Sequence, residues 1–326
     1  MNKEAKLISD LLKFEEKPTR KGYGEGVVLA AKKNENVVVL CADLTESTRN
    51  EEFKKQFPDR FIQMGVHEQL LAALAAGMAL EGKIPYITSY AMFCPGRAWE
   101  MIRTNICLNG VNVKIIGSHA GVSVGPDGAT HQAIEDIAIM RPIPNMTIIA
   151  PCDAIEARKA TVALLDVNGP CYARFAREKS PVFTTEETPF EIGKAEVFRD
   201  GNDVAIVACG PLLYNALIAA EELAKDGFDV RVINSHTIKP LDEKTILAAA
   251  QECGAIVTVE EHQITGGLGG AVTEYLSQAH PTNVLRIGVQ NKFGQSGAPK
   301  ELIEHYGMGV SAIKEAIKKV IQRKNI

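Results

Sequence analysis

Apolar runs of strand length alternate with longer helical patterns along the whole chain, and this alternation restricts the fold more than any other feature. It is typical of parallel α/β units, in which a helix follows each strand and packs back on the sheet. A chain of 326 residues is long enough for about two domains. We therefore expect the α/β fold class, with two parallel-sheet domains.

In the first half, the apolar runs predict strands at residues 37–41, 61–64, 85–88, 113–116, 147–149 and 171–175. Helices are expected at residues 67–81, 95–108 and 153–166, the last with Asp153 as its N-cap. Residues 1–13 mix charged residues with leucines, which predicts an amphipathic first helix.

Residues 179–193 are rich in Pro, Thr and Glu and fit an interdomain linker. We therefore expect one domain over residues 1–185 and a second over 186–326. The second domain has its own α/β series, with expected strands at 204–208, 230–233, 255–259 and 284–287. Its expected helices lie at 212–225, 244–253, 268–278 and 310–323.

Composition excludes several classes of protein. A formal net charge of −4 and 46% hydrophobic residues argue against a disordered chain and against a strongly cationic nucleic-acid binder. The seven cysteines are scattered and never form C-x-x-C, so they indicate reduced core thiols of a cytosolic protein. The N-terminus has no apolar stretch suited to a signal or transmembrane segment, and we expect a cytoplasmic protein.

Polar groups follow expected strands at residues 42–47, 65–68, 89–93 and 118–132, the edge where α/β sheets usually bind ligands. The last segment, SHAGVSVGPDGATHQ, is broken by Gly and Pro yet carries His119, Asp127 and His131. It is either a ligand-binding loop or a glycine-rich turn with solvated histidines. A zinc site is a weaker option, because the spacing is not a compact pair and no further ligand is evident.

Glu68 begins an almost wholly apolar helix pattern. It is either a first-turn carboxylate favoured by the helix dipole or a group facing an interior cleft or interface. Tyr90 and Phe93 follow a strand at a separation that allows both rings to face one ligand, although, taken alone, such rings more often serve core packing than stacking on a ligand.

Taken together, these segments resemble the C-terminal half of transketolase, a thiamine diphosphate enzyme that moves two-carbon ketol units between sugar phosphates. The resemblance extends over essentially the whole chain. It rests on the blocks ADLTES, MGVHEQLLAALAAGMA, SYAMF, SHAGVSVGPDGATHQ, FAREKSP and KFGQSGAPKELIEHYG. It implies a pyrimidine-binding domain followed by a transketolase C-terminal domain.

The resemblance also implies roles for individual residues toward the cofactor. Glu68 matches the glutamate that hydrogen-bonds a pyrimidine ring nitrogen and favours the imino tautomer, which removes the thiazolium proton to give the ylid. Phe93 matches the aromatic residue that stacks on the aminopyrimidine, and Tyr90 is expected to line the same pocket. Asp43 and Leu44 are expected beside the cofactor.

Toward the substrate, His119 and His131 match two histidines that donate hydrogen bonds to the developing alkoxide, and Asp127 matches a residue that accepts from a donor hydroxyl. Positions that match phosphate-binding residues are Arg20, Ser47, His119 and Arg177. One departure is Gly96, which stands where the family often has a third aromatic ring. The pocket is therefore expected to be more open or to be closed by a partner.

The family's diphosphate- and Mg²⁺-binding domain, with its GDG…N motif, has no counterpart in this sequence. The resemblance therefore implies one subunit of a split enzyme, inactive alone, which joins an N-terminal subunit in an α2β2 heterotetramer. The Mg²⁺ ligands are expected from that partner.

Two other readings remain open. The first is a 1-deoxyxylulose-5-phosphate synthase-like or 2-oxoacid dehydrogenase β-subunit-like enzyme, relatives that usually lack a histidine at position 119. The second is a non-catalytic binding or regulatory relative. The glycines of residues 266–270 do not fit the G-x-G-x-x-G register of a dinucleotide site, and we expect them to serve tight packing or subunit contact.

Overall fold

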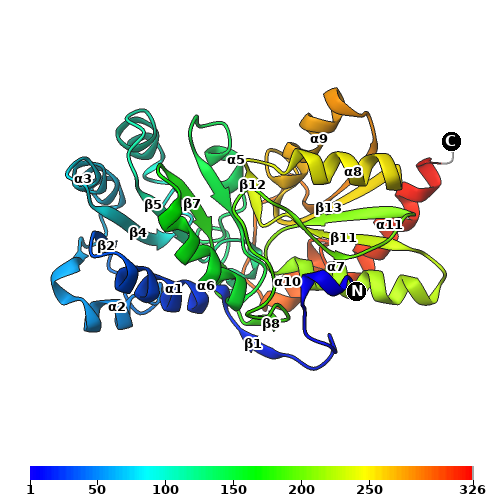
Figure 1. Ribbon diagram of the computed structural model, residues 1–326, viewed down its shortest axis with the longest axis horizontal. Coiled ribbons are helices and arrows are strands. Elements are labelled where there is room, and N and C mark those ends of the chain that lie inside the picture. Colours follow the sequence, from blue (N-terminus) through cyan, green and yellow to red (C-terminus); the bar gives the residue numbers. More distant parts are fainter. Residues whose placement is uncertain (325–326) are drawn as a thin grey trace.

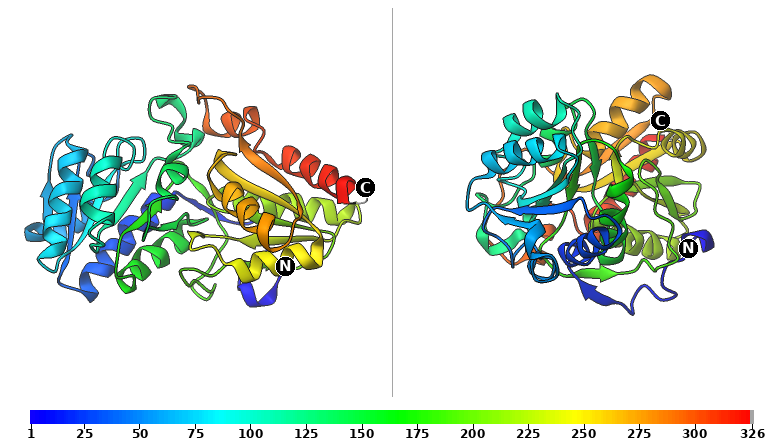
Figure 2. Two further views of the ribbon diagram at one scale, coloured as in Figure 1. Left: turned by 90° about the horizontal axis from the view of Figure 1, so that it is seen from above. Right: turned by 60° about the vertical axis from the view of Figure 1, so that its left-hand side comes forward.

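The computed structural model describes residues 1–324, which form two α/β lobes lying side by side (Figures 1 and 2). One lobe is built on a seven-stranded sheet with the order β12-β6-β7-β5-β4-β2-β3, and the other on a five-stranded sheet with the order β14-β13-β10-β11-β9. The expected fold class, two mostly parallel α/β domains, is confirmed. Residues 325 and 326 of the expected second domain lie outside the described part of the chain.

The seven-stranded sheet is parallel except where β12 joins it. Its central strands are buried on both faces, because helices cover both sides of the sheet. The strands are β2 (Val37–Cys41), β3 (Phe61–Gln63), β4 (Ile84–Tyr90), β5 (Lys114–Ser118), β6 (Thr147–Ile149), β7 (Cys171–Arg174) and β12 (Thr237–Lys239). The helices of this lobe are α1 (Thr19–Lys33), α2 (Glu51–Gln56), α3 (Glu68–Leu80), α4 (Trp99–Met101), α5 (Asp136–Met140) and α6 (Ala154–Ala163).

The five-stranded sheet is parallel except for β9 at its edge. Its strands are β9 (Glu196–Arg199), β10 (Val204–Ala208), β11 (Val230–Asn234), β13 (Ala255–Gln263) and β14 (Asn283–Val289). Its helices are α7 (Leu212–Lys225), α8 (Glu243–Cys253), α9 (Leu268–Ala279), α10 (Pro299–His305) and α11 (Val310–Lys324). All ten expected strands have a counterpart, and most are buried, whereas β3 at the edge of the first sheet and the first part of β14 are partly exposed.

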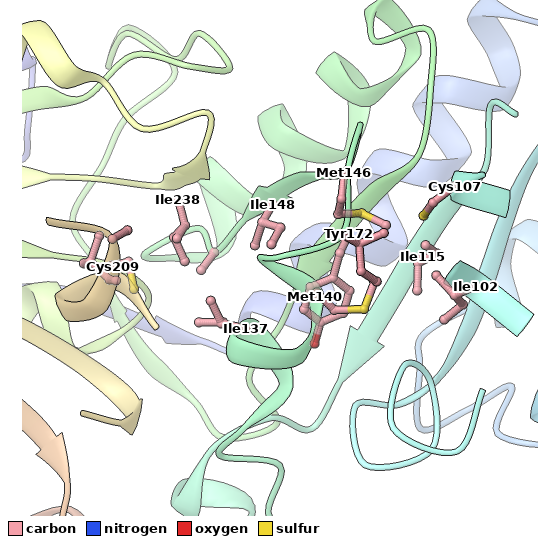
Figure 3. Close-up of a cluster of buried hydrophobic side chains, with 14 of the residues drawn as sticks. Ile102, Cys107, Ile115, Ile137, Met140, Met146, Ile148, Tyr172, Cys209 and Ile238 are labelled. Atoms are coloured by element: carbon pink, nitrogen blue, oxygen red, sulfur yellow. The ribbon is translucent and has the colours of Figure 1, made fainter. Parts of the chain in front are cut away.

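The two lobes share a hydrophobic core. Ile148 of β6 and Tyr172 of β7 belong to the same buried cluster as Cys209 and Ile238, which come from the second half of the chain (Figure 3). β12 also pairs antiparallel with β6, so the second half of the chain contributes a strand to the first sheet. Each fully buried aliphatic side chain stabilises such a junction by about 1.5–3 kcal/mol.

The expected amphipathic helix over residues 1–13 is wrong. Only the 3-10 turn η1 (Lys3–Ala5) forms, and the chain then runs irregularly to the strand β1 (Glu15–Lys17). Backbone contacts explain the difference, because Asn2 N–H donates to the Phe198 carbonyl and Ile8 N–H to the Phe183 carbonyl, both at 3.0 Å. The apolar side chains of this segment pack on the second lobe instead of on a helix of their own.

The helix expected at residues 95–108 begins later and is irregular. The chain first turns tightly after β4, with Cys94 N–H donating to the Tyr90 carbonyl at 2.7 Å. Helical structure begins at α4 and continues as the π-helical segment η3 (Ile102–Cys107). The sequence analysis also assigned no element to residues 19–33, which form α1. Close packing explains its glycines, since a Cβ added at Gly22 would lie 2.1 Å from the Ala154 carbonyl oxygen of α6.

The segment 179–193 is more ordered than an interdomain linker. It begins with β8 (Ser180–Val182), which pairs antiparallel with β1, and it continues into the buried Phe183 and Thr184. Asp153 both caps α6 and accepts hydrogen bonds from the backbone N–H groups of Phe183 and Thr184, at 2.9 and 2.7 Å. The predicted N-cap is thus confirmed, and it also anchors this segment.

Candidate functional site

The carboxyl edge of the seven-stranded sheet gathers the residues that the sequence analysis selected. β2 leads to Asp43 and Leu44, β4 to Tyr90 and Phe93, β5 to His119, and β7 to Arg177, while Glu68 begins α3 just beyond β3. Because these strands are parallel neighbours, their ends lie together. Arg20 joins them from the first turn of α1.

Glu68 lies at the bottom of this edge with only 1% of its surface exposed. Its Oε1 accepts from the Ser89 hydroxyl at 3.2 Å and its Oε2 from Arg97 Nη1 at 2.9 Å. The guanidinium carbon of Arg97 also lies over the Phe93 ring, 4.9 Å from the centroid. Arg97 was missed by the sequence reasoning, although its place four residues after Phe93 is a usable signal. A planar cationic group thus already stacks on Phe93 and binds Glu68.

His119 is buried and its ring stacks on Tyr90, with centroids 4.0 Å apart. Arg20 Nη1 lies 3.2 Å from its Nε2, and since a guanidinium only donates, Nε2 accepts. Nδ1 therefore carries the proton and donates to the Ser118 hydroxyl at 3.0 Å. Burial and then the charges of Arg20 and Arg177 lower the pKa of His119 to about 2. The ring is neutral, and in this arrangement its Nε2 cannot donate, contrary to the expected role.

Cationic groups surround His119. Burial and the nearby charges of Arg49 and Arg177 lower the pKa of Arg20, whose Nε is buried without a hydrogen-bond partner in the described chain. Arg49 was not selected from the sequence, because it follows the polar segment 42–47 instead of lying within it. Arg177 and Arg49 have carboxylate partners, Asp127 at 2.9 Å and Glu51 at 3.9 Å, whereas Arg20 forms no ion pair within the described residues. The positive charge around Arg20 therefore favours a bound anion such as a phosphate.

Asp127 and His131 lie on the loop after β5. Asp127 forms an ion pair with Arg177 at 2.9 Å, and both side chains remain about 30% exposed. His131 Nδ1 contacts the Thr130 hydroxyl at 2.9 Å, and its ring meets the edge of Phe93 with centroids 5.5 Å apart. No hydrogen bond occupies His131 Nε2 within residues 1–324. His131 thus lies beside Phe93 and Tyr90, and Asp127 lies beside Arg177.

The remaining selected residues lie at the margin. Asp43 is exposed and in a left-handed conformation, φ 57°, and its N–H donates to Gln63 Oε1 at 3.1 Å. Ser47 contributes its backbone carbonyl, which accepts from Arg20 Nη1 at 2.8 Å. The Leu44 carbonyl accepts from the Thr48 N–H at 2.8 Å. Within the described residues, no hydrogen bond or ion pair joins Asp43 or Leu44 to Glu68.

The position of Gly96 has a structural reason. A Cβ there would lie 2.0 Å from the Met92 carbonyl oxygen, so the tight turn after β4 leaves no room for a ring. The guanidinium of the next residue, Arg97, lies over Phe93 in its place.

The glycine-rich segment 266–270 is occupied by the chain itself. Glu260 of β13 accepts from the N–H groups of Leu268 at 2.7 Å and Gly269 at 2.8 Å, at the first turn of α9. A Cβ at Gly267 would lie 2.0 Å from Glu260 Oε2. A carboxylate thus fills the helix N-terminus that a dinucleotide phosphate would need. The expectation of tight packing is confirmed.

Across residues 1–324, no group of three or more His, Cys, Asp or Glu side chains is arranged to hold a metal ion. In the same range, no helix combines the length and apolar character required to cross a membrane.

The fold and site define a class of two-domain α/β enzyme in which a buried carboxylate and an aromatic face lie beside an anion-binding cationic cluster. Within that class, the chain matches two family models: the transketolase pyrimidine-binding domain over residues 15–182 and the transketolase C-terminal domain over residues 193–313. The chain belongs to the transketolase family, as the sequence analysis expected.

Similar proteins agree with this assignment. The "Putative transketolase C-terminal section" of Methanocaldococcus jannaschii is 44% identical over 92% of this chain and 95% of its own length. A 6-deoxy-6-sulfo-D-fructose transketolase subunit of a Clostridium species is 38% identical over 96% of this chain and 98% of its own length. The solved structure of a split-gene transketolase, an inactive β4 tetramer, has a TM-score of 0.89 and 41% identity, covering 94% of this chain and 99% of that one.

Proposed function

We propose that this chain is the C-terminal subunit of a split transketolase. With an N-terminal subunit, it transfers a two-carbon ketol unit from a ketose phosphate, such as xylulose 5-phosphate, to an aldose phosphate, such as ribose 5-phosphate. The observation that carries the proposal is the cationic cluster of Arg20, Arg49 and Arg177 around His119, on the same sheet edge as Glu68 and Phe93. A sugar phosphate needs both an anion site and a reaction site.

The residues of this edge fit thiamine diphosphate, which supplies a carbon nucleophile and an electron sink when bound. Arg97 shows that a flat cationic group can stack on Phe93 and bind the Glu68 carboxylate at once. An aminopyrimidine offers the same two features, a flat ring and N–H donors. In this role Glu68 holds a proton at a ring nitrogen, and Tyr90 orients the neighbouring histidine.

The protein's own groups define how a ketose phosphate would bind. Arg20 and Arg177 direct forked donors to the phosphate oxygens, and Asp127 accepts from a sugar hydroxyl once Arg177 turns to the phosphate. His131 Nε2 is free of protein partners in the described chain and donates to the oxygen on which charge develops. His119 keeps Arg20 in position by accepting its hydrogen bond.

An apolar surface supports the need for a partner subunit. The outer face of α3 exposes Leu70 by 54%, Leu74 by 38% and Leu80 by 69%. The sequence of this helix is almost wholly apolar, and in the single chain one apolar face remains uncovered. α3 begins with Glu68, so a chain packed on this face would complete the cofactor site. We assign this face to an α2β2 heterotetramer whose N-terminal subunit binds the diphosphate and its Mg²⁺.

The donor sugar is a second part of the proposal. The sulfofructose-specific name of the Clostridium relative, at 38% identity, favours testing a sulfonated ketose beside xylulose 5-phosphate. A sulfonate also presents three anionic oxygens on a tetrahedral centre, and the same arginines would bind it. Pyruvate has no such distal anion, so the pyruvate-using relatives fit this cluster less well.

The test is calorimetry of thiamine diphosphate and Mg²⁺ binding to the chain alone and to its mixture with the N-terminal subunit. Ketol transfer to ribose 5-phosphate is then measured with xylulose 5-phosphate or 6-deoxy-6-sulfofructose as donor, and consumption of pyruvate is measured in parallel. We expect binding and turnover only in the mixture, with a ketose donor. Tight binding by the lone chain would contradict the split site. Turnover of pyruvate but of neither ketose would reassign the chain to a 2-oxoacid-type reaction. Cofactor binding without turnover of any of the three compounds would favour a binding module.

A further inference from the structure

The loop over residues 119–132, here called the substrate loop, carries three of the proposed substrate-binding residues but has little regular structure of its own. Its one helical piece is the 3-10 segment η4 (Val122–Asp127), which Gly125 interrupts at φ 80°. Gly121 and Gly128 are also left-handed, with φ values of 89° and 74°. Such a loop loses much conformational entropy when it adopts one conformation, so contacts with other parts of the protein must stabilise that conformation.

The first outside contact comes from Glu261 on β13 of the second lobe. Glu261 is 4% exposed, and its Oε1 accepts a hydrogen bond from the Ser123 N–H at 2.6 Å. The carboxylate occupies the space that a side chain at Gly121 would take, since a Cβ there would lie 2.3 Å from Oε1. Burial raises the pKa of Glu261, while Arg174 and the Ser123 N–H act in the opposite direction. Glu261 thus determines where the loop begins.

The second contact closes the other end of the loop. Gln132 is 2% exposed, and its Nε2 lies within hydrogen-bond distance of the carbonyls of Val122 at 3.0 Å and Gly125 at 3.2 Å. The same atom is 2.9 Å from the carbonyl of Gln295, which belongs to the second lobe. A Cβ at Gly294 would lie 1.7 Å from Gln132 Oε1, so this glycine makes room for the amide.

We propose that the second lobe is the template for the substrate loop, with Glu261 and Gln132 as positioning residues that set where Asp127 and His131 present their polar groups. The inference rests on the proposed function of that loop. Neither residue needs to touch the substrate. Glu261 fixes the first turn of the substrate loop, and Gln132 joins the end of this loop to the segment after β14. The second lobe, which holds no proposed catalytic residue, thus determines the geometry of the binding edge.

The test compares Glu261→Ala with Glu261→Gln, and Gln132→Met with Gln132→Glu, in the assembled complex. Glu261→Gln keeps an oxygen for the Ser123 N–H, whereas alanine removes it. We expect the alanine variant to raise KM for the ketose donor about tenfold or more, the range for losing one charge-assisted hydrogen bond, with kcat changed less than threefold. Glutamine is expected to restore KM to within about threefold. Gln132→Met is similar in size but donates no hydrogen bond, and it is expected to raise KM as much as Glu261→Ala does. Gln132→Glu is expected to raise KM equally, because it replaces the donor by an acceptor.

Glu274→Gln and Gln290→Met are matched controls. Glu274 is exposed and forms an ion pair with Arg141, and Gln290 is exposed and directly follows β14. Thiamine diphosphate affinity and thermal stability are measured on every variant. An alanine variant with normal KM would overturn the proposal. Equal impairment of the alanine and glutamine variants, together with lost cofactor binding, would also overturn it, because that pattern indicates a general loss of structure.

Amide hydrogen exchange separates this inference from the proposed function, because it needs no substrate. We expect peptides covering residues 121–128 to exchange at least tenfold faster in Glu261→Ala than in the wild type or Glu261→Gln, while α3 and β4 peptides are unchanged. If the wild-type complex transfers no ketol unit, the proposed function fails and this comparison still decides the template role. Equal exchange in all three proteins would contradict that role.

Discussion

The guanidinium of Arg97 lies 2.9 Å from the buried carboxylate of Glu68 and at the same time covers the ring of Phe93. These are the two groups that we propose for the cofactor pyrimidine. Arg97 is 47% exposed on its side chain, so it can leave toward solvent. Arg97 therefore occupies both groups in the single chain, and a cofactor pyrimidine would have to displace it.

Replacing Arg97 should remove this competition. We expect Arg97→Ala to tighten thiamine diphosphate binding by the assembled complex by up to about fivefold, the effect of losing a partly exposed ion pair worth roughly 0.2–1 kcal/mol. Calorimetry on the complex checks it, with the exposed Arg103→Ala as control. Weaker binding in Arg97→Ala would show instead that Arg97 contacts the bound cofactor.

The carboxylate of Glu68 is expected to be essential for the reaction but not for folding. Glu68→Gln keeps the size and a hydrogen-bond acceptor for Ser89, yet it cannot exchange a proton with the pyrimidine. We expect ketol transfer to fall by at least about a hundredfold, the lower range for general acid–base catalysis. Thermal unfolding should shift by only a few degrees. A Glu68→Gln complex with normal turnover would refute the assignment, and the exposed Glu100→Gln serves as control.

His119 is expected to remain neutral throughout the physiological range. Its pKa is lowered to about 2, so the His119 ring does not become protonated in the folded protein when the pH is lowered from 8 to 5. ¹⁵N NMR of histidine-labelled protein should show the Nδ1-protonated tautomer unchanged over that range, with the signal assigned through a His119→Gln variant. A titration of this signal near pH 6 would contradict the arrangement in which Arg20 donates to Nε2.

The lobes are also joined by a buried carboxyl that titrates near neutrality. Glu156 of α6 accepts from the Cys152 N–H and from Asn234 Nδ2 of the second lobe, each at 2.6 Å, and burial raises its pKa to about 7. An unfolded glutamate titrates at about 4.3, so between these values the folded state binds more protons. The associated stability is fully present below the unfolded pKa and is lost as the pH rises through 7.

Glu156→Gln puts an NH₂ donor in place of one accepting oxygen, a loss that is the same at every pH, but it cannot ionise. Its melting temperature relative to the wild type should therefore increase between pH 5 and pH 8, by at least about 3 °C at roughly 1.4 kcal/mol per pKa unit. Calorimetric scans at both pH values check this difference. The exposed Glu25→Gln is the control, and an identical wild-type-to-variant difference at pH 5 and pH 8 would contradict the raised pKa.

Local patterns accounted for most of the fold. The apolar runs of β2 and β10 have no polar residue to place in water, so they could only become buried strands. The helix α1 was not predicted, because its glycines are unusual in a helix. Gly22 is explained only by the close approach of the Ala154 carbonyl, which comes from a distant part of the chain. The helix predicted over residues 1–13 failed for the same reason, since the hydrogen-bond partners of this segment, Phe183 and Phe198, lie far along the sequence.

The candidate site divides in the same way. The sequence by itself determined which polar residues follow which strands, since strand ends are local features, and the resemblance then supplied expected roles for Glu68, Phe93 and His131. Only the tertiary structure decided that Arg97 pairs with Glu68, that His119 accepts from Arg20, and that Glu261 holds the Ser123 N–H. Hydrogen-bond direction and burial depend on side chains that the fold brings together from different strands and lobes. No spacing along one chain encodes those contacts.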